Sequence, residues 1–265
     1  MVAVDALGLS DDALLAVLHD AASAVRQALD PLADWGLAGT SEWQYRHDLV
    51  ADAAALGVLR GAGLGVVSEE SGSHDGSAGL VVVLDPVDGS TNASRGIPWY
   101  NTSLCALDGS GARAAVVVNQ VSGARFEAVR GGGARCDGRP ISPSGCTAVG
   151  DAIIGLNGYP AHHLGWRQYR ALGAAALDLC AVACGALDGY VDCTSRGHAP
   201  WDYLGGMLIC REAGALVVDA DGEELVTSGH AERRTPVAAA TAELLGELMA
   251  ARRRGSGGRP GPAGP

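Results

Sequence analysis

The segment VVVLDPVDGSTN, residues 81–92, contains an apolar run followed by two carboxylates and a group of small polar residues. The valine and leucine side chains before Asp85 favour a buried β-strand. Asp88 follows three residues later, and a Gly-Ser-Thr sequence then favours the start of a helix. Aspartates also cap ordinary strand-to-helix turns, so this segment alone leaves a purely structural and a chemical interpretation about equally open.

Further acids along the chain favour the chemical interpretation. Glu69 and Glu70 end the preceding apolar strand, and Asp202 lies in the first turn of a later predicted helix. Strand ends and helix starts commonly converge at one crevice of an α/β protein. Several carboxylates gathered there would repel one another unless cations were bound. The pattern therefore predicts two or more divalent metals, because carboxylate oxygens are ligands that suit Mg²⁺.

The Gly-Ser-Thr sequence adds a second chemical property to this segment. Small residues at a helix start let backbone N–H groups approach an anion closely. Metal ions together with backbone N–H groups are what binding of a phosphate ester needs. The sequence thus predicts a metal site and a phosphate site within one turn.

Composition and charge exclude some classes of partner. The chain has 265 residues, 48% of them hydrophobic, which is enough for one large core or two fused lobes. Its formal net charge of -11 argues against nucleic acid and anionic membranes as partners. The chain has no long apolar run, and Asp5 stands where a signal peptide would need basic and apolar residues. We therefore expect a cytoplasmic protein, whose 7 cysteines, without a CxxC pair, are reduced thiols.

Apolar periodicity predicts two helices and a sheet in the first half of the chain. Ser10 has the properties of a helix N-cap, and a second helix is expected from about 48 to 60. The β-rich pieces SLCAL, ARAAVVVNQ and ARFEAV alternate with glycine-containing turns. They predict an antiparallel meander.

The second half alternates expected strands with expected helices. The pieces DAIIGLNG and DGYVDC favour strands, whereas residues 166–187 and the piece PWDYLGGMLICREAG favour helices. Gly214 is placed to end the last of these helices. The alternation predicts a layered α/β architecture.

The end of the chain differs from the rest in composition. Residues 252–265 are rich in glycine, proline and arginine without apolar periodicity, which predicts a disordered tail. Residues 1–251 are then expected to form one two-lobed domain, with lobes of about 1–150 and 151–251.

Five segments in the same order resemble the signature segments of the inositol monophosphatase family. The resemblance covers roughly residues 10 to 245 of this chain. The segments are SEES (68–71), DPVDGSTN (85–92), GGGARCDGRPI (131–141), GAAALDLCAVACGALDGYVD (173–192) and WDYLGGMLICREAG (201–214).

The resemblance implies a fold and an activity. The expected fold is an α/β (α+β) layered α-β-α-β-α sandwich of the inositol monophosphatase and fructose-1,6-bisphosphatase type. The expected activity is a lithium-sensitive, Mg²⁺-dependent phosphomonoesterase with two or three Mg²⁺ ions per active site. We also expect a homodimer that acts on a small phosphate monoester.

The resemblance assigns roles to particular residues. It implies that the metal ligands are Glu69, Asp85, the Val87 carbonyl, Asp88 and Asp202. Ser90 and Asp48, together with Glu69, would orient the attacking water or take its proton. Asp88 and the N–H groups of Gly89 and Ser90 would hold the phosphate.

The substrate alcohol would be recognised elsewhere in the chain. Gly173 and Ala175 match a segment that lines the substrate pocket in this family. Asp192 matches the acid that accepts hydrogen bonds from substrate hydroxyls, although it could also be a solvated strand end. The loop 193–200 is longer than in animal inositol monophosphatases. This difference leaves inositol phosphate, histidinol phosphate, a sugar phosphate and a 3′-phosphonucleotide open as substrates.

Two further interpretations remain at this stage. Arg196 and His198 could bind a second anionic group of the substrate, or they could simply be solvated loop residues. The chain could also be a family member without activity that binds a phosphate or a partner protein. The intact set of acids favours the enzyme.

Overall fold

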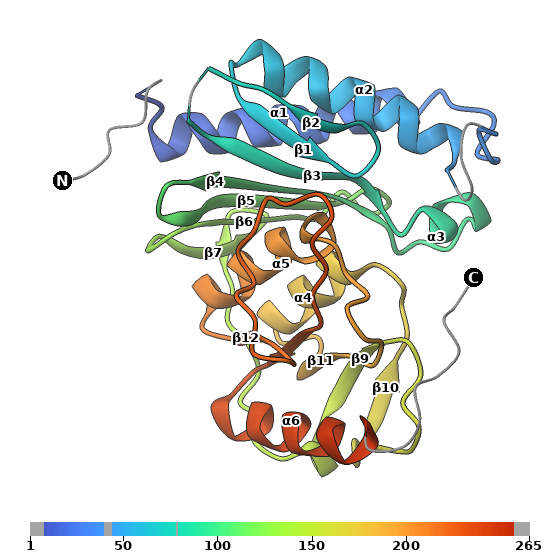
Figure 1. Ribbon diagram of the computed structural model, residues 1–265, viewed down its shortest axis with the longest axis vertical. Coiled ribbons are helices and arrows are strands. Elements are labelled where there is room, and N and C mark those ends of the chain that lie inside the picture. Colours follow the sequence, from blue (N-terminus) through green and yellow to red (C-terminus); the bar gives the residue numbers. More distant parts are fainter. Residues whose placement is uncertain (1–7, 40–43, 78, 257–265) are drawn as a thin grey trace.

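The computed structural model describes residues 8–39, 44–77 and 79–256, which form five stacked layers (Figure 1). Two helices cover the outer face of an eight-stranded sheet, and two more pack between that sheet and a five-stranded sheet. The last helix covers the far face of the second sheet. The predicted α-β-α-β-α sandwich is therefore confirmed. The helices of these layers are, in chain order, α1 (Asp11–Leu29), α2 (Arg46–Gly61), α4 (Ala175–Ala183), α5 (Pro200–Ala213) and α6 (Ala242–Ser256).

The first sheet has the strand order β2-β1-β3-β4-β5-β6-β7-β8. Only β1 and β3 pair in parallel, and the other neighbours are antiparallel, so the meander predicted for the middle strands is confirmed. The strands are β1 (Gly65–Ser68), β2 (Gly72–His74), β3 (Val81–Asp88), β4 (Asn101–Asp108), β5 (Gly111–Asn119), β6 (Arg125–Val129), β7 (Gly133–Cys136) and β8 (Arg139–Pro140).

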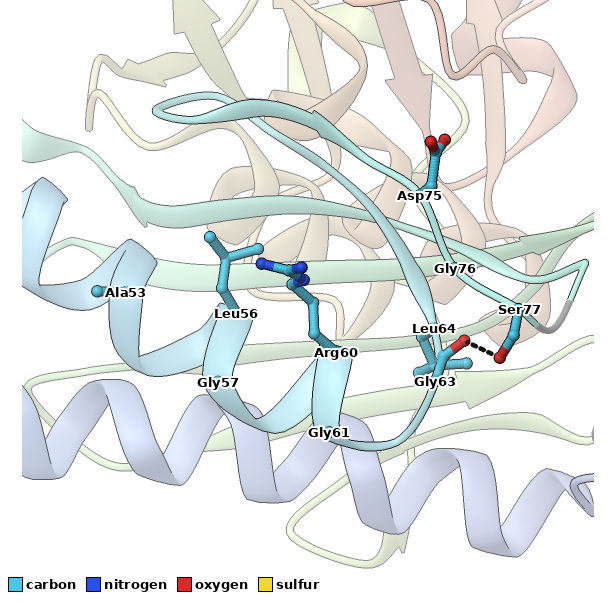
Figure 2. Close-up of a pocket in the computed structure, with 10 residues that line it drawn as sticks. All are labelled: Ala53, Leu56, Gly57, Arg60, Gly61, Gly63, Leu64, Asp75, Gly76 and Ser77. Carbon is cyan, nitrogen blue, oxygen red and sulfur yellow. Dashed lines mark hydrogen bonds between the residues drawn. The ribbon is translucent and has the colours of Figure 1, made fainter.

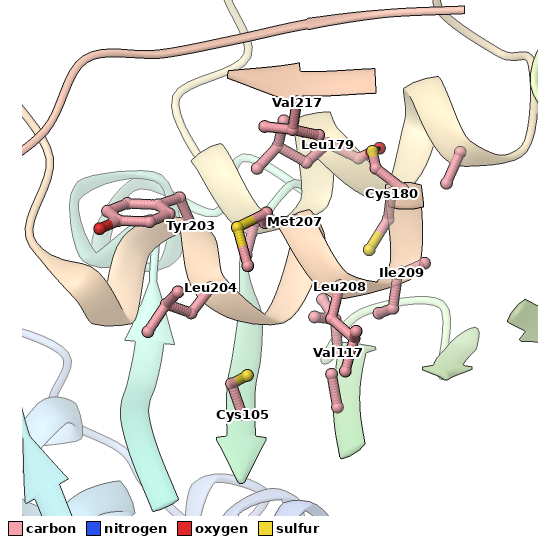
Figure 3. Packing of buried hydrophobic residues seen from close by; sticks show 14 of the residues in the cluster. Cys105, Val117, Leu179, Cys180, Tyr203, Leu204, Met207, Leu208, Ile209 and Val217 are labelled. Atoms are coloured by element: carbon pink, nitrogen blue, oxygen red, sulfur yellow. Dashed lines mark hydrogen bonds between the residues drawn. The ribbon is translucent and has the colours of Figure 1, made fainter. Parts of the chain in front are cut away.

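The first half of strand β3, Val81–Leu84, is apolar because both faces of the strand are covered. Val82 and Leu84 pack in the core beneath α1 and α2, whereas Val83 packs in the core around α4 and α5. Figure 3 shows this second core, where Leu204 and Leu208 of α5 lie against the sheet. Alternate side chains of β3 thus pack into the two cores on opposite faces of the sheet. This packing fixes the register of β3 and therefore the position of Asp85 and Asp88 at its end.

Local hydrogen bonds determine where the two helices of the outer layer begin. Ser10 Oγ accepts from Ala13 N at 3.2 Å, as its predicted N-cap role requires. Helix α2 begins at Arg46, two residues before the expected start. The reason is that Asp48 is the third residue of the helix, and its Oδ2 accepts from Tyr45 N at 3.1 Å.

The second sheet has the order β10-β9-β11-β13-β12, in which β9, β10 and β11 are parallel. Two short helical elements complete the fold, α3 (Ser90–Arg95) and a 3₁₀ turn at Val149–Asp151. The strands are β9 (Ile153–Asn157), β10 (Gln168–Arg170), β11 (Gly189–Asp192), β12 (Leu216–Asp219) and β13 (Pro236–Ala239).

The helix predicted over 166–187 is wrong at its start. Residues Gln168–Arg170 form the edge strand β10, and α4 begins only at Ala175. Gly173 separates the two elements because its φ of 80° lies in the left-handed region, which a continuing helix excludes. By contrast, α5 ends as expected, with Gly214 at φ 100°.

The first residues of the tail predicted from residue 252 are helical instead. Helix α6 continues to Ser256, and the Arg252 guanidinium holds it against the second sheet. Arg252 Nε donates to the Asp192 carbonyl and Nη2 donates to the Thr194 carbonyl, each at 2.9 Å. The remainder of the predicted tail, 257–265, and the N-terminal stretch that contains Asp5 lie outside the described residues. None of the helices that the structure describes is long and apolar enough to cross a bilayer.

Candidate active site

The predicted acids meet where β1 and β3 end side by side. These two strands are parallel, and Glu69 N donates to the Leu84 carbonyl at 3.2 Å just after β1. Asp85 follows Leu84 in β3, and α3 begins directly after Asp88 with Gly89 as its N-cap. The electrostatic effects of Asp202, at the start of α5, reach Glu69, Asp85 and Asp88.

Asp85 lies at the centre of this group and has an unsatisfied oxygen. The residue is 1% exposed, and its buried Oδ1 atom has no hydrogen-bond partner. Burial raises the pKa of Asp85 well above its usual value, and the charges of Glu69, Asp88 and Asp202 raise it further. A cation bound here would stabilise the ionised form of this buried carboxyl group.

Glu69 behaves in the same way although part of the residue is exposed. Burial of its carboxyl group raises the pKa of Glu69 well above the usual value, and the charge of Asp202 adds to the effect. The mutual effect on pKa shows that these side chains, which are far apart in sequence, share one electrostatic environment.

Asp88 is held by both the first sheet and the middle helices. Its Oδ2 accepts from Asn101 Nδ2 and from Ala176 N, both at 2.8 Å, and its Oδ1 accepts from Ala175 N at 3.2 Å. Burial raises the pKa of Asp88 to about 7, and the charge of Asp202 contributes to the increase. The N–H of Ala175, predicted to line the substrate pocket, is thus engaged by a predicted metal ligand.

Ser90 and Asp48 form the contact that the sequence predicted. Ser90 Oγ lies 2.7 Å from Asp48 Oδ1 and 2.8 Å from the Val87 carbonyl oxygen. Its single proton serves one of these acceptors at a time. Burial raises the pKa of Asp48 to about 7, against the opposing effect of the Ser90 hydrogen bond. His47 adds no charge, because burial lowers its pKa to about 4.

Gly89 must be glycine for two reasons. Its φ is 90°, and an added Cβ would lie 3.1 Å from the Trp99 carbonyl oxygen and 3.2 Å from that of Gly173. The start of α3 and the segment before α4 therefore approach one another closely. Asn92 fixes this approach, since its Nδ2 donates to the carbonyls of Trp99 at 2.8 Å and Leu172 at 2.7 Å.

Asn92 and Asn101 are functional candidates that sequence analysis did not single out. Asn92 is part of the DPVDGSTN segment, and its position there was the available signal. Asn101 had no comparable signal, because its bond to Asp88 depends on strand pairing between β3 and β4.

Asp192 does not lie at a solvated strand end. The residue is 0% exposed, and its Oδ1 accepts from Asn157 Nδ2 at 3.1 Å, Thr194 N at 2.9 Å and Thr194 Oγ1 at 2.7 Å. Its Oδ2 is buried without a hydrogen-bond partner. Direct contact between Asp192 and a substrate hydroxyl would therefore require the loop 193–200 to move.

The two basic residues of this loop already face carboxylates. The Arg196 guanidinium pairs with Glu223, and its backbone has a φ of 53°. The His198 ring is buried, with Nδ1 3.3 Å from Asp202 Oδ2. These contacts do not support the hypothesis that the pair receives a second anionic group.

One hollow of the described surface lies away from these acids. It has a volume of about 850 Å³ and lies between the C-terminal half of α2 and the segment after β2, where Figure 2 shows Arg60 and Asp75 among its lining residues. None of the predicted site residues lines it. One arginine and one aspartate among small and apolar residues define no chemistry, so the acid group remains the candidate site.

The acid group suits divalent cations, although its side chains are not arranged as a finished ligand set. Among the residues that the structure describes, no three His, Cys, Asp or Glu side chains hold the geometry of a complete metal site. The unsatisfied Asp85 Oδ1 and the raised pKa values of Glu69, Asp85 and Asp88 are the features that a bound cation would relieve. An all-oxygen donor set suits Mg²⁺ or Mn²⁺.

Comparison with known proteins identifies the class. The model of the inositol monophosphatase family matches residues 60–256, and the chain therefore belongs to that family. It is a phosphatase of this family, with the mixed α/β layered fold of inositol monophosphatases and fructose-1,6-bisphosphatases.

Similar proteins carry more than one name. A fructose-1,6-bisphosphatase of Pyrococcus furiosus is 33% identical over 202 residues, which is 75% of this chain and 78% of the relative. The Nus factor SuhB of Pasteurella multocida is 30% identical over 219 residues, 76% of this chain and 80% of the relative. A solved structure from Pyrococcus horikoshii, described as similar to inositol-1 monophosphatase, has a TM-score of 0.83 and 28% identity, covering 91% of this chain and 99% of that one.

The raised pKa values give the metal-free protein a characteristic pH dependence. A carboxyl group whose pKa is higher in the folded state binds protons more tightly there, so stability falls as pH rises toward that pKa. For Asp48 and Asp88, with values of about 7, the decrease continues to near pH 8. His47 has the opposite effect only below its ordinary pKa of 6.5.

We therefore expect the melting temperature of the metal-free protein to decrease as the pH is raised from 6.5 to 8. We expect Mg²⁺ to raise the melting temperature more at pH 8 than at pH 6.5. Differential scanning fluorimetry in EDTA and in Mg²⁺ measures both effects, with Ca²⁺-free NaCl of equal ionic strength as the control. A melting temperature that rises with pH in EDTA would contradict the repulsion among these acids.

Proposed function

We propose that this chain is a Mg²⁺-dependent phosphomonoesterase that hydrolyses a small phosphorylated alcohol by in-line attack of water. One observation carries the proposal: the Ser90 hydroxyl contacts the buried Asp48 carboxylate beside Asp85, whose Oδ1 has no protein partner. Asp48, a possible proton acceptor, therefore lies near Asp85, a possible metal ligand, at the start of helix α3.

The residues that would hold the Mg²⁺ ions are Glu69, Asp85, the Val87 carbonyl, Asp88 and Asp202. When bound, such ions lower the pKa of water and neutralise charge on the phosphate and on the leaving oxygen. The burial and mutual repulsion that raise the pKa values of these carboxyl groups would also favour a bound cation, which has to displace their protons.

Ser90 and Asp48 would handle the proton of the attacking water, and Glu69 would help to orient that water. The Ser90 hydroxyl accepts the proton while passing its own to Asp48 Oδ1, 2.7 Å away. A pKa of about 7 suits Asp48 to this role near neutral pH. The backbone at Gly89 and Ser90, with Gly173 opposite, would border the phosphate.

The proposed substrate is a small polyol or sugar phosphate. The family description supports inositol monophosphate, and the relative named fructose-1,6-bisphosphatase supports a sugar phosphate. Histidinol phosphate and a 3′-phosphonucleotide remain the other substrates to compare. The same proposal includes a homodimer, which size-exclusion chromatography with light scattering tests.

A second candidate function is binding of a partner protein without catalysis, which the relative named Nus factor SuhB brings into consideration. Phosphate release from a panel of these monoesters in Mg²⁺ and in EDTA separates the two functions. Turnover that depends on Mg²⁺ supports the phosphatase, and no release from any ester in Mg²⁺ would overturn it.

Lithium is expected to inhibit this turnover at millimolar concentrations. A small monovalent cation can occupy one of the positions among the carboxylates without neutralising the leaving oxygen as a divalent ion does. Rates are compared in LiCl and in NaCl of the same concentration. Equal rates in the two salts would contradict the assigned group of metal ligands.

A further inference from the structure

A buried imidazole connects a proposed metal ligand to the interior of the second sheet. His198 is 8% exposed, and its Nδ1 lies 3.3 Å from Oδ2 of Asp202. On the opposite side of the ring, Nε2 lies 2.8 Å from the hydroxyl oxygen of Tyr190, a residue that is 0% exposed. The ring therefore has a polar partner at each nitrogen, and only one of them belongs to the acid group.

Asp192 lies behind this imidazole rather than at an open pocket. Its buried Oδ2, which has no hydrogen-bond partner, is 3.8 Å from His198 Nε2. Its Oδ1 is occupied by three donors from Asn157 and Thr194. The carboxylate is thus oriented toward the histidine, and solvent does not reach it.

The backbone on both sides of this group is fixed. His198 exchanges two hydrogen bonds with Arg234, at 3.1 Å from its N–H and 2.7 Å to its carbonyl. Arg252 donates to the carbonyls of Asp192 and Thr194, both at 2.9 Å. These bonds keep the strand end and the loop in register, so the ring has little freedom to leave its position.

We propose that Tyr190 and His198 form a buried hydrogen-bonded chain that positions Asp202, and that Asp192, buried behind the ring, does not touch the substrate. The inference rests on the proposed function, because Asp202 matters here as a metal ligand. With its proton on Nδ1, His198 donates to Asp202 while Nε2 accepts from the Tyr190 hydroxyl. The tyrosine thereby fixes both the tautomer and the orientation of the ring.

Groups that orient a metal ligand affect metal affinity even when they are distant from the metal. Loss of such an outer partner typically lowers metal affinity or activity by about ten- to a hundredfold. Ala199 N also donates to Asp202 Oδ2, at 2.7 Å, so part of the orientation survives without the histidine. We therefore expect effects near the lower end of this range.

The test is isothermal titration of the full chain with Mn²⁺, which suits the same oxygen ligands as Mg²⁺. Tyr190→Phe removes one oxygen atom from this chain of contacts and is expected to weaken Mn²⁺ binding several-fold. Tyr203→Phe is the matched control, because Tyr203 is equally buried and its hydroxyl donates to the Leu225 carbonyl at 2.7 Å, outside this chain of contacts.

Substitutions of His198 provide a rescue experiment. His198→Ala is expected to weaken Mn²⁺ binding about tenfold. His198→Asn is expected to recover most of that loss, since its amide nitrogen takes the place of Nδ1 and can donate to Asp202. If the alanine variant does not fold, Tyr190→Phe still decides the question.

Kinetics on two substrates separate the proposed role from a direct one. If Asp192→Asn leaves Mn²⁺ affinity unchanged and raises KM for inositol 1-phosphate but not for p-nitrophenyl phosphate, Asp192 contacts the substrate and the inference is wrong. If Tyr190→Phe matches Tyr203→Phe in Mn²⁺ affinity, the inference is also wrong while the proposed function stands. If the unsubstituted chain neither binds Mn²⁺ nor releases phosphate, the proposed function itself is wrong, and the inference with it.

Discussion

Replacing Asp85 with Asn is expected to lower kcat/KM by about a hundred- to a thousandfold without loss of the fold. The Asp85 side chain is central to the acid group and is buried, so the loss of its charge weakens every cation held there. Breaking a buried charge pair by removing one partner costs about 3 to 5 kcal/mol, and ~1.4 kcal/mol corresponds to a tenfold change in rate.

The fold is expected to survive because Asp85 Oδ1 has no protein partner to lose. Asparagine has the same shape, and it removes repulsion from Glu69 and Asp88. We therefore expect the metal-free variant to melt at a higher temperature than the parent at neutral pH, while its activity is largely lost. Phosphate release at saturating Mg²⁺ and thermal melting in EDTA measure the two effects.

Asp75→Asn is the matched control for this substitution, because Asp75 is an exposed acid that lies in the hollow beside α2 and away from the site. Its activity should equal that of the parent. Activity of Asp85→Asn within a few-fold of the parent would contradict the assignment of Asp85 as a shared metal ligand.

The second large effect is expected at Asp48. Asp48→Asn should lower kcat by about a hundred- to ten-thousandfold with little change in KM, the range typical for removal of a general base. The asparagine Oδ1 can still accept from Tyr45 N, so the start of α2 is retained, while its Nδ2 donates to Ser90 Oγ, whose own proton then goes to the Val87 carbonyl. What is lost is the ability to hold a proton.

Ser90→Ala combined with Asp48→Asn tests whether the two residues work together. Residues that act as a unit give losses that are not additive, so the double variant should be no worse than Asp48→Asn alone. Asp52→Asn, one turn further along α2, is the control, because Asp52 is buried and accepts from Ser68 but does not contact Ser90. Additive losses for Ser90 and Asp48 would show that they act independently.

The sequence was most informative where local pattern and long-range packing agree. Strand β3 was predicted because its continuous apolar run is typical of a buried strand. The end of helix α5 was predicted because a glycine there is typical of a helix C-terminus. The helix over 166–187 failed because β10 is an exposed edge strand, paired only with β9, and has no apolar alternation of its own. The tail prediction was wrong for residues 252–256 because composition does not report the contacts that Arg252 makes with Asp192 and Thr194.

The candidate site shows the same division. Asp85 and Ser90 belong to one of the segments whose order along the chain indicated the family, the resemblance assigned Asp48 to the same site, and the structure places Ser90 against Asp48. The burial of Asp192 and the contacts of His198 depend on how the loop 193–200 packs on Arg234. No periodicity or motif encodes that packing, so the sequence suggested substrate contacts where the structure shows a chain of buried polar groups.

Anomalous diffraction from crystals of the full chain soaked in Mn²⁺ tests the central claim most directly. The account predicts at least two anomalous peaks, with Asp85 oxygen atoms about 2.0 to 2.5 Å from both, the range of bonds between such metals and carboxylates. Anomalous peaks found only at other acids would contradict the account. So would the lack of any anomalous peak near Glu69, Asp85, Asp88 and Asp202 at saturating Mn²⁺.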